Sequence, residues 1–121
     1  MKTEKILSLA VEALDSKKAL DISAIKVSDL TVVTEYFVIA SATSSTHVRS
    51  LAEETEDKLS KAGVEPNHIE GRATNWILLD YGSVIIHVFT RDAREFYNLD
   101  RIWSDGEHIE LEKLISSGEE D

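Results

Sequence analysis

The sequence predicts one α/β (α+β) domain of three layers, in which helices flank a mixed β-sheet. Stripes of apolar residues at helical spacing alternate with short runs of branched and aromatic residues. In addition, no repeat, low-complexity tract or Pro/Gly-rich linker divides the 121 residues, a length typical of one domain. We therefore expect a domain at residues 1–105 and an acidic C-terminal tail at residues 106–121.

The first predicted helix covers residues 3–16, where apolar side chains recur at spacings of three and four. Residues 19–27 are rich in branched side chains without helical periodicity, which predicts a strand. Residues 35–41 are apolar on both alternating faces, as in a strand that is buried on both sides of a sheet. These two strands are expected to form part of the central sheet.

A second helix is predicted to begin after Ser44 or Ser45, because either side chain can cap a helix N-terminus. An apolar stripe follows, and Gly63 and Pro66 end the helix. Residues 68–70 then lead to the next pair of strands.

Two β-rich runs, residues 76–79 and 84–89, flank a turn sequence and predict a hairpin. We expect Leu79 to lie opposite Val84, and Trp76 opposite His87. Because strand side chains alternate, one face of this hairpin is wholly apolar. The other face mixes aromatic, imidazole and carboxylate groups and is the better candidate for recognition: Trp76, Leu78, Asp80, Ile85, His87 and Phe89.

A third helix is expected to start near Thr90 or Asp92 and to stop before residue 105, with Phe96 buried on its apolar stripe and Tyr97 at the edge. The rest of the chain has six acidic residues and one base, and it is interpreted as a tail whose last residues are mobile. Apolar residues in it could anchor a short element: Ile109, Leu111, Leu114 and Ile115.

Composition limits the class of function. The formal net charge of -10 argues against direct nucleic-acid binding, which needs clustered Lys and Arg. A basic protein partner suits this charge better, although acidity that only maintains solubility is the simpler explanation of composition alone. No apolar run is long enough to span a membrane, and the chain has neither cysteine nor an Arg- and Ser-rich transit segment. We expect a bacterial cytoplasmic protein.

The sequence lacks the motifs of common catalytic and metal sites. There is no Gly-rich phosphate loop, metalloprotease helix or nucleophile elbow, and the four histidines have no metal-ligand spacing. We therefore predict no metal and no cofactor. His87, in an apolar strand, is more typical of a hydrogen-bonded structural histidine than of a base. Asp80 either serves turn chemistry, by accepting backbone N–H groups, or anchors an interface together with Trp76 and His87.

A set of short motifs, taken in order, resembles the Iojap, or ribosomal silencing factor S, family from about residue 20 to residue 105. The motifs are Asp21-Ile22, Ser28-Asp29-Leu30-Thr31, Tyr36-Phe37-Val38-Ile39-Ala40-Ser41, Glu70-Gly71, Trp76-Ile77-Leu78-Leu79-Asp80-Tyr81-Gly82, His87-Val88-Phe89 and Arg94-Glu95-Phe96-Tyr97-Asn98-Leu99-Asp100. The chain departs from the family pattern at Glu35, at Ala42 and at Thr46-His47-Val48, whereas the Trp-to-Tyr block is intact.

The resemblance implies a fold similar to nucleotidyltransferases without their catalytic acids, and a protein that is not an enzyme. It implies binding to the large ribosomal subunit through ribosomal protein L14, a steric block to subunit joining that represses translation when nutrients are short, a role in large-subunit maturation, and homodimers. The candidate partner-binding residues are Trp76, Leu78, Asp80, Tyr81, His87, Tyr97 and Asp100.

Two other functions remain open from the sequence. An active nucleotidyltransferase would need carboxylates converging on magnesium, but Gly82-Ser83 is followed by Val84-Ile85-Ile86-His87 instead of acids. A dimerisation module without a ribosomal role is the other alternative.

Overall fold

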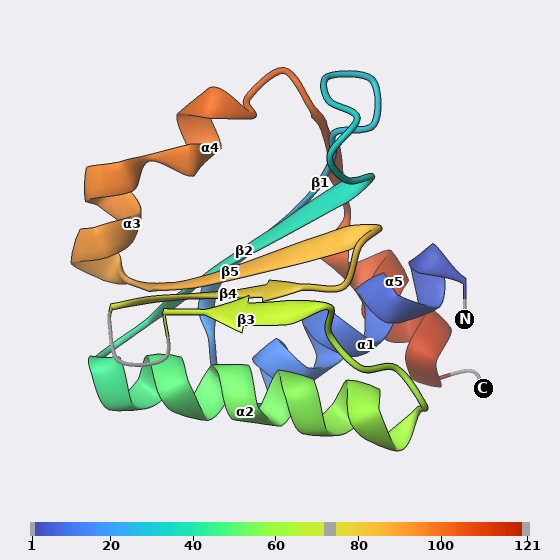
Figure 1. Ribbon diagram of the computed structural model, residues 1–121, viewed down its shortest axis with the longest axis horizontal. Coiled ribbons are helices and arrows are strands. Elements are labelled where there is room, and N and C mark those ends of the chain that lie inside the picture. The colour runs from blue at the N-terminus through green and yellow to red at the C-terminus, as the bar shows by residue number, and fades with distance from the viewer. Residues whose placement is uncertain (1, 72–74, 120–121) are drawn as a thin grey trace.

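The computed structural model describes residues 2–71 and 75–119, which form a six-stranded sheet with helices on both faces (Figure 1). The three-layer α/β prediction is therefore confirmed, with the sheet mixed as expected. The elements are α1 (Thr3–Ser16), β1 (Leu20–Lys26), β2 (Tyr36–Ala42), α2 (Ser45–Lys61), β3 (His68–Glu70), β4 (Trp76–Asp80), β5 (Val84–Thr90), α3 (Arg91–Tyr97), α4 (Leu99–Ile102), β6 (Glu107–Ile109) and α5 (Leu111–Glu119).

The strands lie in the order β3-β4-β5-β2-β1-β6. Only the central β2–β5 pair is parallel, and the other neighbours are antiparallel. All residues of β2 except Tyr36 are buried, which confirms the prediction of a strand covered on both sides. A strand inside a sheet with helices on both faces has no solvent-facing side, so its sequence is apolar without alternation.

The first two helices match the sequence prediction closely. α1 has the predicted bounds, and the side chain of Ser44 caps α2 by accepting the backbone N–H of His47 at 3.1 Å. Gly63 follows α2 with a φ of 87°, a conformation that glycine adopts without strain. None of the described helices is long and apolar enough to cross a membrane.

The register of the β4–β5 hairpin differs from the prediction by two residues. Trp76 lies opposite Phe89, and Leu79 lies opposite Ile86. The turn is centred on Gly82 and Ser83, because a φ of 82° at Gly82 suits the first position of a two-residue turn. A shift of two residues leaves side-chain alternation unchanged, so the predicted division into two faces is correct.

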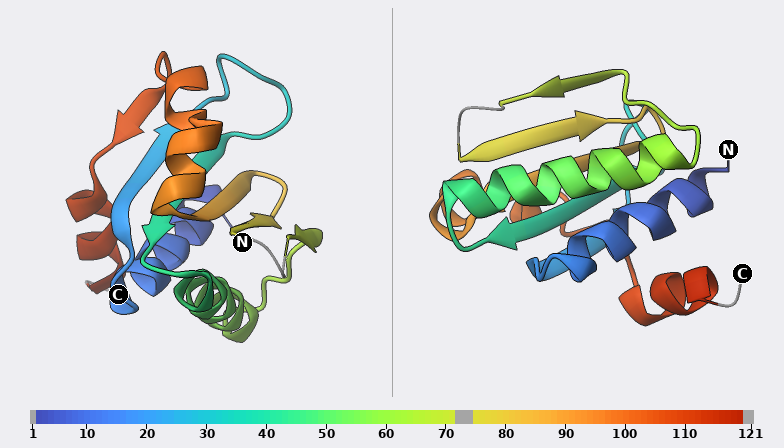
Figure 2. Two further views of the ribbon diagram at one scale, coloured as in Figure 1. Left: turned by 90° about the vertical axis from the view of Figure 1, so that its left-hand side faces the viewer. Right: turned by 90° about the horizontal axis from the view of Figure 1, so that it is seen from below.

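Each face of the sheet has its own apolar core. The larger core lies between the sheet and α1, α2 and α5, and it includes the apolar face of the hairpin. The smaller core lies under α3 and α4 and contains Ile25, Val27, Phe37, Ile39, Ile85 and Phe89. Figure 2 shows α3 and α4 on one side of the sheet and α1 and α2 on the other.

The predicted third helix is two short helices. Asn98 adopts a left-handed conformation with a φ of 50° and separates α3 from α4. The prediction that Phe96 is buried was wrong, since its side chain is 81% exposed. The break at Asn98 interrupts the helical periodicity from which that prediction was made, and Ala93, Leu99 and Trp103 contact the core in place of Phe96.

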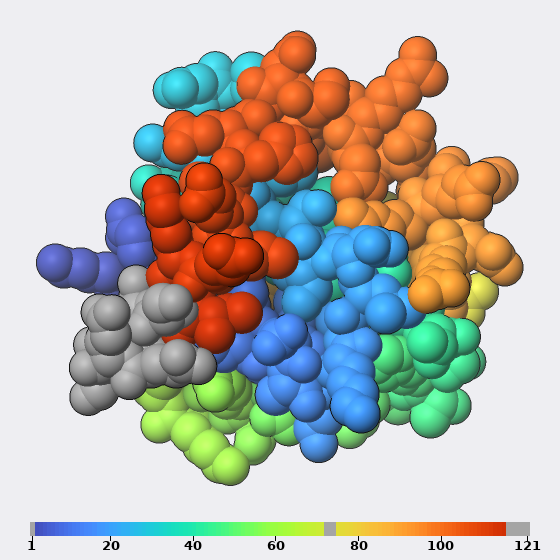
Figure 3. Space-filling model, turned by 180° about the vertical axis from the view of Figure 1, so that it is seen from behind, coloured from blue at the N-terminus to red at the C-terminus, as the bar shows by residue number. Residues whose placement is uncertain are grey.

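The segment interpreted as a tail contains a strand and a helix that pack on the domain. β6 pairs with β1 at the edge of the sheet, and α5 packs on α1. In Figure 3, the red atoms of the C-terminal segment lie against blue atoms of the N-terminal part of the chain. The apolar residues singled out in the sequence make these contacts: Ile109, Leu111, Leu114 and Ile115. The expectation of mobile last residues concerns residues 120–121, which lie outside the described residues.

Candidate functional site

A groove of about 700 Å³ opens between β4 and α3, on the face of the sheet that carries the smaller core. Most of its surface is apolar, because aromatic and aliphatic side chains form its floor and walls. The described residues that line it are Glu70, Gly71, Asn75, Trp76, Leu78, Asp92, Ala93, Phe96 and Tyr97. A concave apolar surface with a few polar groups at its rim is typical of a binding site.

Aromatic rings form one wall of this groove. The ring of Trp76 stacks on Phe89 with centroids 4.8 Å apart, and it meets the ring of Tyr97 at 4.7 Å. Phe96 contacts Tyr97 edge-on at 5.1 Å and projects into solvent. Trp76 is therefore held by neighbours on its buried side, while part of its surface faces the groove.

His87 lies beneath this wall and fixes the Trp76 ring. The indole Nε1–H of Trp76 donates to His87 Nδ1 at 3.1 Å, which places the proton of the neutral imidazole on Nε2. Burial lowers the pKa of His87 to about 4, so the ring is neutral at physiological pH. The prediction of a hydrogen-bonded structural histidine is confirmed.

Asp80 lies at the end of β4 remote from Trp76. Its Oδ1 accepts the backbone N–H of Gly82 at 2.8 Å, and its Oδ2 is 3.5 Å from Nδ1 of His68. The turn-chemistry interpretation of Asp80 is therefore confirmed. Its role in binding a partner stays a prediction.

Tyr81 and Asp100 also lie apart from the groove. Tyr81 packs into the larger core on the opposite face of the sheet, where burial raises the pKa of its hydroxyl. Asp100 is paired with Arg94. Of the seven residues predicted to bind a partner, four gather at the groove or beneath it: Trp76, Leu78, His87 and Tyr97.

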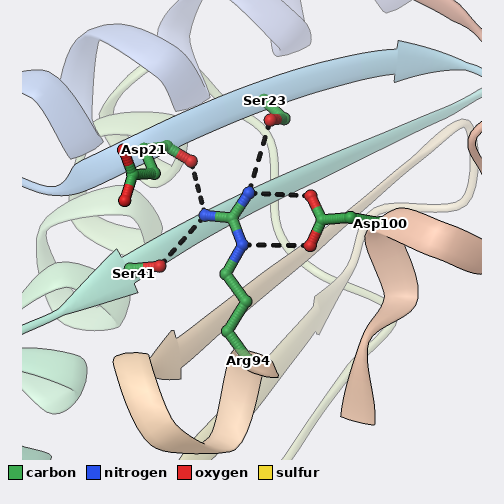
Figure 4. Close-up of polar contacts among 5 residues, drawn as sticks. All are labelled: Asp21, Ser23, Ser41, Arg94 and Asp100. Atoms are coloured by element: carbon green, nitrogen blue, oxygen red, sulfur yellow. Dashed lines mark hydrogen bonds and ion pairs between the residues drawn. The ribbon is translucent and has the colours of Figure 1, made fainter. Parts of the chain in front are cut away.

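Arg94 was named from the sequence only as part of a family motif, but its contacts in the structure make it a functional candidate. Its guanidinium forms a two-bond fork with Asp100 and also donates to the carbonyl of Asp21 and to the hydroxyls of Ser23 and Ser41 (Figure 4). The hydrogen bonds from Arg94 hold the pKa of the Asp100 carboxyl below its usual value. This network connects α3 and α4 to β1 and β2.

Three lining residues of α3 were not among the binding residues predicted from the sequence: Asp92, Ala93 and Phe96. Asp92 and Phe96 are separated by four positions, as are Ala93 and Tyr97, so each pair shares one side of the helix. A helical spacing applied to residues 91–97 alone would have brought them together. The longer helix that we predicted placed Phe96 in the core instead.

The charged groups among the described lining residues are the carboxylates of Glu70 and Asp92. An apolar groove with an acidic rim favours an apolar or aromatic side chain flanked by cations. No group of three or more His, Cys, Asp or Glu side chains within residues 2–71 and 75–119 is arranged to hold a metal ion.

Comparisons with known proteins agree with the motif pattern. The family model described as "Ribosomal silencing factor during starvation" matches residues 1–121. The ribosomal silencing factor RsfS of Halalkalibacterium halodurans is 35% identical over 117 residues, which cover 96% of this chain and 100% of that protein.

A solved structure and a mouse protein are also similar to this chain. A crystal structure of a Chromobacterium violaceum protein has a TM-score of 0.84 and 33% identity, covering 86% of this chain and 88% of that one. The mouse protein named mitochondrial assembly of ribosomal large subunit protein 1 is 33% identical over 102 residues, covering 81% of this chain and 45% of that protein.

Proposed function

Because this chain belongs to the ribosomal silencing factor family, whose members are non-enzymatic ribosome-binding proteins, we propose that it docks on the large ribosomal subunit through ribosomal protein L14. A domain bound at this place would occupy space that the small subunit needs. Subunit joining would then fail, and translation would fall when nutrients are limiting.

The observation that carries this proposal is the groove between β4 and α3. It exposes Phe96 and Tyr97 to solvent beside Trp76, and aromatic residues of this kind supply most of the affinity at protein interfaces. Nearly all other large apolar side chains of β4 and β5 are buried in one of the two cores. The groove therefore has the features of an anchor site for a protein.

Charge supports the same partner class. The chain has a formal net charge of -10, and Glu70 and Asp92 lie at the rim of the groove. A basic ribosomal protein would be attracted by this field, which raises the association rate more than the final affinity. We accordingly place the action of this protein in the cytoplasm, where ribosomes are found.

Two further properties belong to the proposal. One is a role in large-subunit maturation, which is consistent with the name of the mouse relative. The other is a homodimer in the absence of ribosomes, which light scattering over a wide concentration range would test. A chain that stays monomeric at every concentration would remove the dimer and leave ribosome binding untouched.

The test of docking is comigration with large ribosomal subunits in sucrose gradients. Trp76→Ala should abolish comigration, but it also removes ring contacts and the hydrogen bond to His87. Phe96→Ala is the sharper variant, because its side chain is 81% exposed and contributes little to the core. Loss of an interface aromatic costs about 2 kcal/mol or more. Ile102→Ala, at an exposed position of α4 outside the groove, is the matched control.

We expect wild type and Ile102→Ala to comigrate with large subunits and to inhibit their joining to small subunits, whereas Phe96→Ala does neither. Equal binding by all three proteins would contradict the assignment of the groove. Wild-type protein that remains at the top of the gradient would favour a dimerisation module without a ribosomal role.

A further inference from the structure

We propose that Arg94 is the positioning residue of the groove: by joining α3 and α4 to the sheet, it holds Tyr97 against Trp76 and so maintains the docking wall. The inference rests on the proposed function in so far as the groove is the docking surface. Its structural half, that Arg94 fixes the α3–α4 segment, is independent of any partner.

Every N–H group of the Arg94 guanidinium has an acceptor. Nε donates to Asp100 Oδ2 at 3.1 Å, and one terminal nitrogen donates to Asp100 Oδ1 at 2.8 Å and to Ser23 Oγ at 3.4 Å. The other terminal nitrogen donates to Ser41 Oγ at 3.0 Å and to the carbonyl of Asp21 (Figure 4). With all five donors used, the side chain has a structural task and no donor left for a ligand.

The sheet is shaped locally to receive this side chain. The pairing of β1 with β2 shifts between Leu20 and Ser23, where β1 contains one residue more than its partner. Asp21 lies in this bulge with a φ of 47°, a conformation that costs energy for a residue other than glycine. A bulge redirects backbone and side-chain groups, and here the carbonyl of Asp21 and the hydroxyl of Ser23 meet Arg94.

The helix that carries the groove wall, α3, and the helix that follows it, α4, need such an attachment. α3 has seven residues and α4 has four, and neither contains a buried residue. Helices this short are unstable on their own and depend on tertiary contacts. Arg94 precedes the break at Asn98 and Asp100 follows it, so their fork joins the two helices across the break.

A lysine at position 94 would keep the positive charge but not the fork. The guanidinium is planar and binds both carboxylate oxygens at once, whereas an ammonium group is a point charge that cannot reach all four acceptor residues together. Arg94→Lys therefore tests geometry and not charge. Arg101→Lys is the matched control, because Arg101 lies on α4 with an exposed side chain.

The experiment measures hydrogen exchange of the full chain by residue, together with binding to purified large ribosomal subunits. For Arg94→Lys we expect exchange of the α3 and α4 amides to rise at least about tenfold, with β2 and β5 amides as protected as in wild type. Affinity for large subunits should fall about tenfold. Asp100→Asn, which keeps the shape of the acceptor, should change both quantities in the same direction by a smaller factor, and Arg101→Lys should change neither.

Three results would overturn the inference. Unchanged α3–α4 exchange in both Arg94→Lys and Asp100→Asn would show that Arg94 does not hold the segment. Faster exchange there with unchanged affinity would show that the segment does not position the docking wall. Loss of β2 and β5 protection in both variants would make Arg94 a general stability residue. Failure of the docking proposal itself is recognised separately, by wild-type protein that does not bind large subunits at all.

Discussion

The face of the sheet under α1, α2 and α5 differs from the face under α3 and α4 in how completely helices cover it. On the first face, three longer helices enclose an apolar core in which almost every large side chain is inaccessible. On the second face, two short helices cover only part of the sheet and leave the groove beside β4 open. The same hairpin contributes alternate residues to both.

Because of this difference, one face of the β4–β5 hairpin serves the stability of the fold and the other face is available for recognition. Leu79 is fully buried beneath α2, whereas its neighbour Leu78 lines the groove on the other face. Helix cover excludes water and maximises the stabilisation from each apolar group. A face left partly uncovered stabilises the fold less, but it presents aromatic surface to a partner.

The largest expected effect comes from truncating the enclosed face. Leu79→Ala should lower the free energy of unfolding by about 3 kcal/mol, because it removes buried atoms and leaves a cavity. Leu78→Ala, the matched change one residue earlier, should cost about 1 kcal/mol and weaken large-subunit binding instead. Urea unfolding measures the free energy of unfolding, and sedimentation with large subunits measures binding. Equal stability losses for both variants would mean that the two faces do not differ as described.

The second prediction uses His87, the titratable group buried under the groove. Its pKa is about 4 in the folded protein and near 6.5 in the unfolded chain. The unfolded state therefore binds the proton first as pH falls, so the free energy of unfolding declines from pH 6.5 to pH 4, by about 3 kcal/mol in total. Protonation would also remove the acceptor that holds the Trp76 indole.

Chemical unfolding at a series of pH values measures this decline. His87→Gln is the control, since its amide oxygen is able to accept from Trp76 without titrating in this range. Asp100 affects stability in a lower pH range than His87. Because its pKa is lowered in the folded protein, its carboxylate stabilises the fold above the ordinary carboxyl pKa, and this stabilisation is lost as the pH falls below that value. A His87→Gln variant with the same slope as wild type between pH 6.5 and pH 4 would refute the role of His87.

The sequence allowed the two faces of the hairpin to be assigned, and the reason is physical. Side-chain direction in a strand depends on position alone, so Trp76 and His87 share a face even though their predicted pairing was two residues out. The large-scale fold followed similarly from caps and apolar stripes, such as Ser44 before α2.

What the sequence did not reveal depends on contacts between distant segments. Arg94 meets Asp21, which is 73 positions away, through a bulge that has no sequence signature. The left-handed Asn98 divides α3 from α4, and the ion pair between Arg94 and Asp100 spans this break. Tyr81 is a different case. It was predicted to bind a partner because it belongs to the same motif as Asp80, but alternation along the hairpin turns it toward the larger core.

A third prediction concerns the turn that fixes the register of β4 against β5. Gly82→Ala should cost about 1–2 kcal/mol of stability, because a φ of 82° is unfavourable for alanine, and the added Cβ would lie 3.3 Å from the side chain of Asn67. Gly63→Ala has the same backbone strain but no atom within 4 Å, so it isolates the contribution of the contact. Thermal unfolding gives the melting temperatures of the two variants for comparison. Gly82→Ala melting at or above the temperature of Gly63→Ala would show that the contact at the turn is relieved without cost.

The smallest effect is expected at Asp80, which lies on the groove face but at the far end of β4. Asp80→Ala loses the hydrogen bond to Gly82 and should cost about 1 kcal/mol of stability, whereas Asp80→Asn keeps an acceptor and should cost less. Both variants remove a charge that attracts a basic partner, so both should slow association with large subunits a few-fold at low salt. This difference should disappear at high salt, where charges are screened beyond about one Debye length. An affinity loss that persists at high salt would instead make Asp80 a direct contact, and the docking surface would then extend along the whole of β4.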